Sequence, residues 1–200
     1  MQSALTGLLD GTCRAELRQP LRGHIVKGHP PMVRPTAPVP LIGMTLLKPG
    51  DGFPALTLTT AAGELALPEA LTGDFGIVLV NRGVWCPYCA SQLRSFQRAQ
   101  PKLAEAGAKV VALWVDDEAT TKDFIDKNNI QFPIGYGADA VAVAAATGAF
   151  VNLDPTYLQS TGFVLDPNGK VLVSVYSSGA IGRLVPDDVI GMIQYVRSQH

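Results

Sequence analysis

The sequence predicts an α/β fold with a mixed central sheet and helices on both of its faces. Short, fully apolar runs alternate with stretches whose apolar residues recur at helical spacing, and this alternation requires parallel strands in the centre of the sheet. A strong hairpin turn at Asn168-Gly169, late in the chain, adds antiparallel strands. The expected order is hairpin, strand, helix, strand, helix, helix, hairpin and helix.

The first expected element is an N-terminal hairpin of the folded region. Apolar and polar residues alternate from Leu56 to Thr59, and Leu65 and Leu67 lie two positions apart, as on one face of a returning strand. A short helix is expected over 68–71. The run over 77–80 is apolar throughout and rich in β-branched residues, which indicates a strand buried on both faces.

A helix is expected to begin near Pro87, because proline is well tolerated at the first helical position. Pro101 should kink or split this helix, and Gly107 should end it. The residues of its buried face share helical spacing and are Leu93, Phe96 and Leu103.

The second half of the chain continues the alternation. Its expected elements are strands over 110–115, 132–134, 162–165 and 171–175, and helices over 118–127, 138–146 and from Pro186 onward. Asp116 and Asp117 stand where the N-cap of the helix over 118–127 is needed. The segment over 179–183 is too irregular for a phosphate-binding loop, and we interpret it as a turn before the last helix.

The composition excludes several classes of function. The 200-residue chain has a formal net charge of −1 and is 47% hydrophobic, as is typical of a globular protein. A chain with this charge balance is not expected to bind nucleic acid, and no apolar run approaches the length of a membrane span. The first residues lack the pattern of a secretory signal, so the expected location is cytoplasmic.

Two regions are expected along the chain. Residues 1–44 are interpreted as an N-terminal arm or linker, because five prolines between Pro30 and Pro40 exclude a helix there. Residues 45–200 are interpreted as one folded domain. Cys13 lies in the arm, either as an incidental cysteine or as a distal resolving one.

Cys86 and Cys89 are the candidate catalytic residues. Cys86 follows the apolar strand and stands at the mouth of the expected helix, where the helix dipole and free backbone N–H groups lower the pKa of a thiol. Cys89 lies three residues further on, on the same helix face and within disulfide reach. We therefore expect Cys86 to be the exposed attacking thiolate and Cys89 the more buried resolving cysteine. The expected supporting residues, which add positive charge, shield the sulfur and begin the helix, are Arg82, Trp85 and Pro87.

The cysteine pair has two other interpretations. Both cysteines could be inert packing residues. A zinc site would need more ligands than the pair supplies, and the other candidates show no ligand spacing to it. These other candidates are Cys13, His24, His29 and His200. No metal and no bound cofactor are therefore expected.

On these residues the chain resembles the peroxiredoxin-like (AhpC/TSA, redoxin) family of the thioredoxin superfamily over roughly residues 45–198. The specific part of the resemblance is the segment Arg82-Gly83-Val84-Trp85-Cys86-Pro87-Tyr88-Cys89, and weaker matches lie over 47–54 and 161–169. The resemblance implies a thioredoxin-like fold and a thiol-dependent antioxidant enzyme in which Cys86 attacks a peroxide oxygen. The Cys-Pro-Tyr-Cys motif is also similar to that of glutaredoxins.

The chain departs from the family pattern at three positions. Typical members carry a proline seven residues and a threonine or serine three residues before the attacking cysteine, where this chain has Leu79 and Gly83. They also place an arginine before the late strand, where this chain has Ser160. Arg82 and Arg94 are the candidates to replace that arginine.

The expected function is a dithiol/disulfide cycle of Cys86 and Cys89 that reduces hydroperoxides. Electrons would come from a thiol reductant: thioredoxin, glutaredoxin or a low-molecular-weight thiol. One alternative is a thioredoxin- or glutaredoxin-like reductase of disulfide substrates, and another is a redox sensor that forms the disulfide without turnover. A homodimer is one possible assembly.

Overall fold

The computed structural model describes residues 45–199, and within them the expected fold class is confirmed. The expected arm over residues 1–44, with Cys13, His24 and His29, lies outside the described residues, as does His200. No helix in the described part has the length and apolar character needed to cross a membrane.

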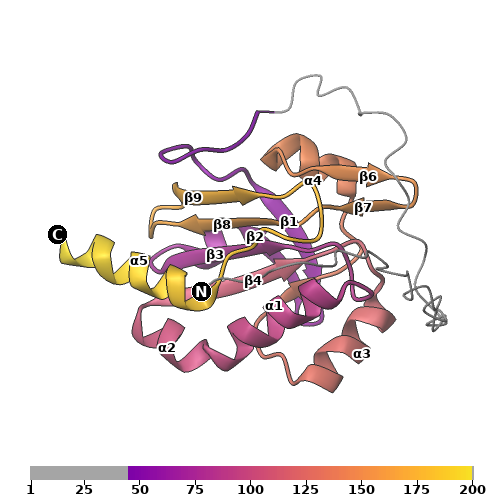
Figure 1. Cartoon of the computed structure of the whole chain (residues 1–200), viewed down its shortest axis with the longest axis horizontal. Coiled ribbons are helices and arrows are strands. Elements are labelled where there is room, and N and C mark those ends of the chain that lie inside the picture. Colours follow the sequence, from indigo (N-terminus) through magenta and orange to yellow (C-terminus); the bar gives the residue numbers. More distant parts are fainter. Residues whose placement is uncertain (1–44, 200) are drawn as a thin grey trace, which may run out of the picture. The chain divides into compact units, whose positions relative to one another are not determined.

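A five-stranded mixed sheet forms the centre of the fold (Figure 1). In spatial order its strands are β5 (Ile134–Gly135), β4 (Ala108–Leu113), β3 (Phe75–Val80), β8 (Thr161–Leu165) and β9 (Val171–Tyr176). β3, β4 and β5 pair in parallel, whereas β8 is antiparallel to both β3 and β9. The parallel and antiparallel halves that the sequence predicts therefore meet at β3.

The central strand β3 is buried on both faces, as its apolar run predicts. Successive side chains of a strand point to opposite faces, so Ile77 and Leu79 pack into the core on one side of the sheet and Val78 and Val80 into the core on the other. All four are at most 1% exposed. Burial of this strand fixes the position of the loop that follows it.

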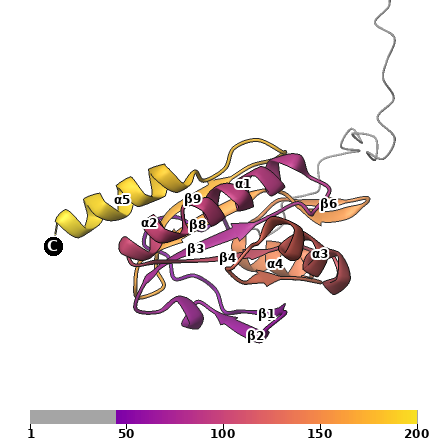
Figure 2. The ribbon, with the colours of Figure 1, turned by 90° about the horizontal axis from the view of Figure 1, so that it is seen from below.

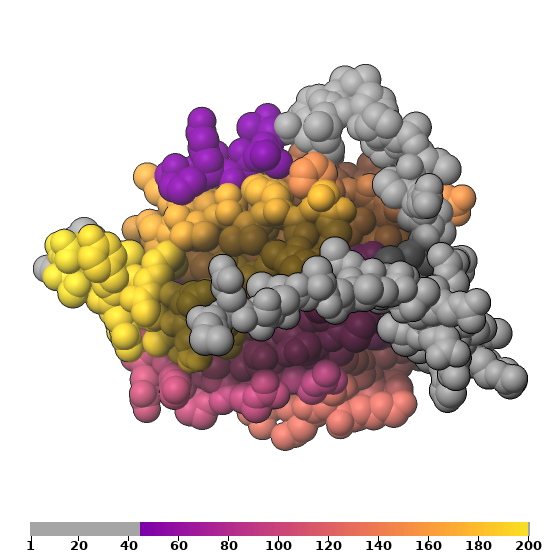
Figure 3. All heavy atoms as spheres, in the orientation of Figure 1, coloured from indigo at the N-terminus to yellow at the C-terminus, as the bar shows by residue number. Residues whose placement is uncertain are grey.

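Helices cover the first face of the sheet. They are α1 (Pro87–Arg98), α2 (Gln100–Glu105), α3 (Glu118–Asn128) and α5 (Pro186–Ser198). Leu93 and Phe96 of α1 and Ile193 of α5 are fully buried in the same core cluster. α5 lies beside α2 in both ribbon views, and its yellow atoms meet the pink atoms of α2 in Figure 3.

The opposite face carries a hairpin, a helix and a second small hairpin. These elements are β1 (Leu56–Thr60), β2 (Gly63–Leu67), the 3-10 turn η1 (Glu69–Leu71), α4 (Ala140–Thr147), β6 (Val151–Leu153) and β7 (Thr156–Leu158). Figure 2 shows β1 and β2 on the side of the sheet away from α1, α2 and α5. The core beneath them includes Leu58, Leu67, Val143 and Leu158.

Pro101 splits the predicted helix, as expected: α1 ends at Arg98 and α2 begins at Gln100. The β6–β7 hairpin is not among the elements predicted from the sequence. Its strands have three residues each, too few for periodicity to indicate a strand.

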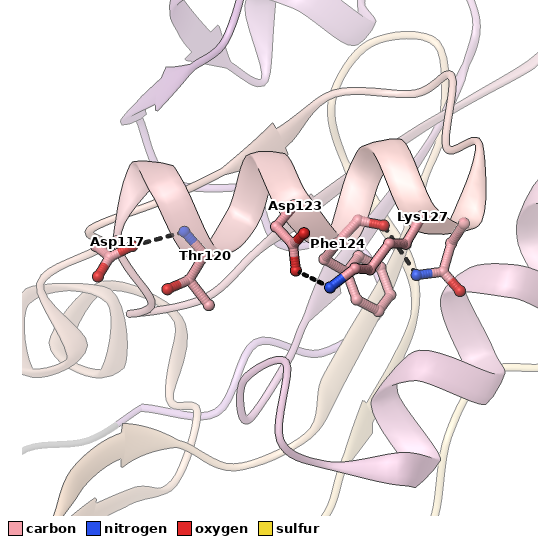
Figure 4. Close-up of polar contacts among 6 residues, drawn as sticks. Asp117, Thr120, Asp123, Phe124 and Lys127 are labelled. Atoms are coloured by element: carbon pink, nitrogen blue, oxygen red, sulfur yellow. Dashed lines mark hydrogen bonds and ion pairs between the residues drawn. The ribbon is translucent and has the colours of Figure 1, made fainter.

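The predicted cap of α3 belongs to Asp117 alone (Figure 4). The Thr120 backbone N–H donates to its carboxylate at 2.7 Å, and this bond lowers the pKa of Asp117. Further along the same helix, Lys127 and Asp123 form an exposed ion pair at 2.6 Å. The expectation that Asp116 shares the cap was wrong, because its carboxylate faces the loop after β3 instead.

The strand register brings several loops to one edge of the sheet. Val80, the last residue of β3, pairs with Thr161 at the start of β8, and Thr161 pairs with Tyr176 at the end of β9. β9 therefore runs in the same direction as β3. The loop from β3 to α1, the β6–β7 hairpin that precedes β8, and the loop from β9 to α5 all meet at this edge.

Candidate functional site

Cys86 is the N-cap residue of α1. Its backbone is extended, with φ −86° and ψ 112°, and Pro87 begins the helix after it. The Cys86 carbonyl accepts the first helical hydrogen bond from the Ala90 N–H at 3.1 Å. The sulfur is thus attached where the positive end of the helix dipole is strongest, as the sequence predicts.

Both sulfurs are buried, which corrects one expectation. Cys86 is 1% exposed and Cys89 is 0% exposed, and both cysteines are free thiols. Cys86 was expected to be exposed because it precedes the helix. Two guanidinium groups lie against its sulfur, that of Arg82 from the same loop at 3.9 Å and that of Arg183 from the loop between β9 and α5 at 3.8 Å.

Arg183 joins the two cysteines. Its Nη2 lies 3.2 Å from Sγ of Cys89 and 3.8 Å from Sγ of Cys86. This residue lies in the loop between β9 and α5, which we interpreted from the sequence as a plain turn. A guanidinium that donates to both sulfurs can stabilise a negative charge on either one.

The guanidinium of Arg183 is fixed by amide and carbonyl oxygens. Its Nη1 donates to Gln92 Oε1 at 2.9 Å and to Asn81 Oδ1 at 3.4 Å, and its Nε donates to the Ala180 carbonyl at 3.1 Å. Gln92 in turn donates through Nε2 to the Leu184 carbonyl at 3.1 Å, which fixes the orientation of its amide. These partners are neutral, so the positive charge of Arg183 remains available to the sulfurs.

Arg82 approaches Cys86 from another side. Its Nη1 lies 3.9 Å from Sγ of Cys86, and its Nη2 donates to the Tyr157 hydroxyl at 3.0 Å. Its guanidinium carbon also lies over the rings of Trp85 and Tyr157, at 4.7 and 5.1 Å from their centroids. The Arg82 backbone N–H donates to Sγ of Cys89 at 3.3 Å. Arg82 therefore contacts both cysteines, one through its side chain and one through its backbone.

The two thiols of this site differ in pKa. The pKa of Cys86 is lowered to about 5, first because the Cys89 thiol donates a hydrogen bond to its thiolate. Burial opposes this change, and the charges of Arg183 and Arg82 add to it. The pKa of Cys89 is raised, by the same hydrogen bond and by burial. Cys86 is the thiolate of the pair, and Cys89 is the protonated thiol.

The reactivity of Cys86 should follow this lowered pKa. Only the thiolate is nucleophilic, so its alkylation by iodoacetamide should fall as the pH falls through about 5 and stay constant from pH 7 to 9. Cys89 should contribute little because its pKa is raised. Alkylation rates measured from pH 4 to 10, with the modified cysteine located by mass spectrometry, check this prediction. A midpoint near the ordinary value of 9.0 would contradict it.

Asp116 supports the loop that carries the cysteines. Its Oδ2 accepts the Val84 N–H at 2.8 Å, and burial raises the pKa of this carboxyl group. Gly83 has φ +140°, and a Cβ there would lie 2.6 Å from Nε1 of Trp85 and 2.8 Å from Asp116 Oδ2. The family's usual threonine therefore could not occupy position 83 without moving this loop.

The structure separates the two arginine candidates. Arg94 donates to Asn128 Oδ1 at 3.3 Å on the exposed side of the fold and makes no hydrogen bond to either sulfur. Ser160, at the position where the family pattern has its arginine, is buried, and its carbonyl accepts the Ser177 N–H. The described residues contain no group of side chains suited to hold a metal ion.

Sequence reasoning missed Arg183, Tyr157 and Gln92. The sequence marks Arg183 only as the one basic residue between 171 and 196, and the strand direction that gives this position its meaning comes from the structure. Arg183 follows a strand that runs parallel to β3, and loops at the carboxyl ends of such strands gather at one edge. Tyr157 and Gln92 carry no comparable signal, because their roles depend on tertiary contacts.

Comparisons with known proteins concern the family and the fold of the chain. A protein-family model described as the AhpC/TSA family matches residues 49–174. A curated relative called peroxiredoxin from Methanothermobacter thermautotrophicus is 29% identical over 154 residues, which are 74% of this chain and 72% of that protein. A peroxiredoxin from Chlorobaculum tepidum is 27% identical over the same shares of the two chains.

Solved structures support the fold. Mycobacterium tuberculosis AhpC has a TM-score of 0.65 at 19% identity, over 78% of this chain and 96% of that one. A peroxiredoxin-like protein from Aquifex aeolicus has a TM-score of 0.65 at 17% identity, over 76% of this chain and 89% of that one. At such identities the likeness concerns the fold alone.

Proposed function

The chain belongs to the AhpC/TSA family of thiol-dependent peroxidases, and we propose that Cys86 is its attacking cysteine and Cys89 its resolving cysteine. The observation that carries this assignment is the convergence of two guanidinium groups on the sulfur of Cys86 at the N-terminus of α1. Neither Arg82 nor Arg183 forms an ion pair with a carboxylate in the described part of the chain. The natural counter-charge of both groups is the Cys86 thiolate.

The chemistry proceeds in two steps. The Cys86 thiolate attacks the terminal oxygen of a hydroperoxide, the O–O bond breaks, and the sulfur becomes a sulfenic acid while an alkoxide leaves and takes a proton from water. The sulfur of Cys89 then attacks that of Cys86, and the hydroxyl departs with the Cys89 proton as water. The pair has lost two electrons, and the peroxide has become an alcohol and water. A thiol reductant restores the dithiol.

Arg82 is the group that we assign to the leaving oxygen. Its Nε is buried without a hydrogen-bond partner in the described residues, and its guanidinium lies beside the attacking sulfur. Arg183, by contrast, already uses all three of its nitrogens, in bonds to both sulfurs, two amides and a carbonyl. Arg183 therefore holds the thiolate, and Arg82 has donors free for the substrate.

Burial of the pair favours a small hydroperoxide over a protein disulfide as the oxidised substrate. A peroxide oxygen can reach a sulfur that is 1% exposed, whereas a protein disulfide needs a sulfur at the surface. Reduction of a disulfide substrate is therefore the second candidate function. A sensor that forms the disulfide without turnover is the third.

Steady-state assays separate these functions. With a thiol reductant in excess, the full-length protein should consume hydrogen peroxide or an organic hydroperoxide over many turnovers and should reduce insulin disulfides slowly or not at all. Faster reduction of insulin than of peroxide would favour the disulfide reductase. One equivalent of peroxide consumed per protein, followed by no further reaction, would indicate the sensor.

We place the enzyme in the cytoplasm, with residues 45–200 as its catalytic domain and residues 1–44 as an arm. Peroxiredoxins use thiol reductants and often form dimers. Thioredoxin, glutaredoxin and a low-molecular-weight thiol are the candidate reductants here, and a homodimer is the candidate assembly.

A further inference from the structure

Tyr157 contacts the active-site arginine in two ways. Its hydroxyl accepts a hydrogen bond from Arg82 Nη2 at 3.0 Å, and its ring lies beneath the Arg82 guanidinium at 5.1 Å. The same ring meets Trp85 edge to face, with centroids 5.1 Å apart. Arg82 therefore packs on two aromatic rings that also support each other, and its guanidinium has little freedom to move.

The fold gives Tyr157 a fixed position beside Arg82. In β7, Leu158 is fully buried in the core beneath α4, so the alternation of the strand turns Tyr157 to the other side. β7 leads into β8, whose first residue Thr161 pairs with Val80. Arg82 follows Val80 by two residues, so the end of β3 and the start of β8 bring the two side chains together although they are 75 positions apart in sequence.

We propose that Tyr157 is a positioning residue that holds the guanidinium of Arg82 beside the sulfur of Cys86. The inference rests on the proposed peroxidase function, in which Arg82 donates to the leaving oxygen. Apart from its hydrogen bond to Tyr157, the Arg82 side chain makes one further hydrogen bond in the described structure, the long one of 3.9 Å to the Cys86 sulfur, and its other contacts are with the aromatic rings. Without the phenol, the guanidinium would have no oxygen to orient it.

This arrangement assigns a function to the β6–β7 hairpin. A guanidinium stabilises a developing negative charge only where its donors already face the oxygen that receives the charge. The hairpin supplies that orientation from outside the Cys-Pro-Tyr-Cys loop. The loss of this orientation should therefore slow the reaction with peroxide, in which an oxygen leaves. It should not change the rate at which the Cys86 thiolate reacts with an alkylating reagent.

A double-mutant cycle tests the inference. Tyr157→Phe keeps the ring and removes the hydroxyl, and we expect it to lower the second-order rate constant for peroxide about tenfold, because a hydrogen bond to a charged group is lost. In an Arg82→Met background the same substitution should have no further effect. Tyr88→Phe is the matched control, because Tyr88 is 51% exposed and its hydroxyl makes no hydrogen bond in the described structure.

Alkylation by neutral iodoacetamide at pH 8 supplies the second readout. Cys86 stays ionised at this pH, so Tyr157→Phe should change its alkylation rate less than twofold. Tyr157→Leu, which also removes the ring, should lower the peroxide rate constant further and leave alkylation equally unchanged.

Three results would overturn the proposal. The first is an unchanged peroxide rate constant in Tyr157→Phe. The second is a fall of this rate constant in the Arg82→Met background that equals the fall in the wild-type background. The third is a parallel fall in the alkylation rate of Cys86, which would indicate a structural role for Tyr157. If the wild-type protein failed to react with peroxide at all, the proposed function would fall together with this inference. If Arg82→Met lowered the peroxide rate constant and Tyr157→Phe did not, only the role of Tyr157 would be lost.

Discussion

Replacing Cys86 with serine is expected to lower the rate of peroxide reduction at least about a thousandfold, because a serine hydroxyl stays protonated at neutral pH and is a poor nucleophile. Replacing Cys89 with serine should leave the first reaction with peroxide nearly intact, since a hydroxyl at position 89 can still donate to the Cys86 thiolate. The cycle should then stop at a sulfenic acid on Cys86, because no second sulfur lies in α1 to resolve it.

Rapid-mixing peroxide assays without reductant, followed by mass spectrometry of the product, measure both effects. The wild-type protein should yield a Cys86–Cys89 disulfide, and Cys89→Ser should yield a sulfenic acid that a dimedone probe captures. Cys13→Ser is the matched control and should behave as the wild type. If Cys13→Ser prevented disulfide formation and Cys89→Ser did not, Cys13 would be the resolving cysteine and the proposed pair would be wrong.

The parts of this site that the sequence predicts are those encoded within a few residues of one another. The apolar run that ends at Val80, followed by Pro87, places Cys86 at the start of a helix, and the structure has it as the N-cap. The spacing of Cys86 and Cys89 then puts both sulfurs on one helix face. These are properties of a strand, a short loop and a helix, each of which periodicity and proline placement can indicate.

The parts that the sequence does not predict come from strand register. Arg183 is 97 residues from Cys86, and the two meet because β9 runs parallel to β3 and ends at the same edge of the sheet. Local periodicity contains no information on which strands become neighbours. The expected exposure of Cys86 was wrong in part for the same reason: a position at a helix N-terminus does not show that Arg183, 97 residues further along the chain, lies against the sulfur.

The same strand register explains how the chain can lack an arginine at the position where the family pattern has it. The family pattern places its arginine before the late strand, where this chain has the buried Ser160. Here positive charge comes from Arg82, just after β3, and from Arg183, just after β9. Both positions lie at the sheet edge where α1 begins. Arginines from different places in the sequence can therefore give the same positive electrostatic potential at the attacking sulfur.

Arg183→Met is expected to have the second-largest effect on peroxide reduction. Methionine keeps much of the volume and removes the charge and the bonds to both sulfurs. Loss of a nearby positive charge should raise the pKa of Cys86 above the value of about 5 in the wild type. At pH 8, where the thiol is still largely ionised, the rate constant for peroxide should fall about a hundredfold, because the sulfur is no longer held in the position from which it attacks the peroxide oxygen.

The pH profile distinguishes this role from a purely structural one. Alkylation by iodoacetamide should show a midpoint above the value of about 5 for the wild type, and Arg183→Lys should restore part of the shift because it retains the charge without the planar fork. Arg94→Met is the matched control, since Arg94 lies on α1 but bonds Asn128 on the exposed side. If Arg183→Met slowed the reaction without moving the midpoint, Arg183 would only hold the loop before α5, and the charge on Cys86 would have to depend on the helix dipole, Cys89 and Arg82 alone.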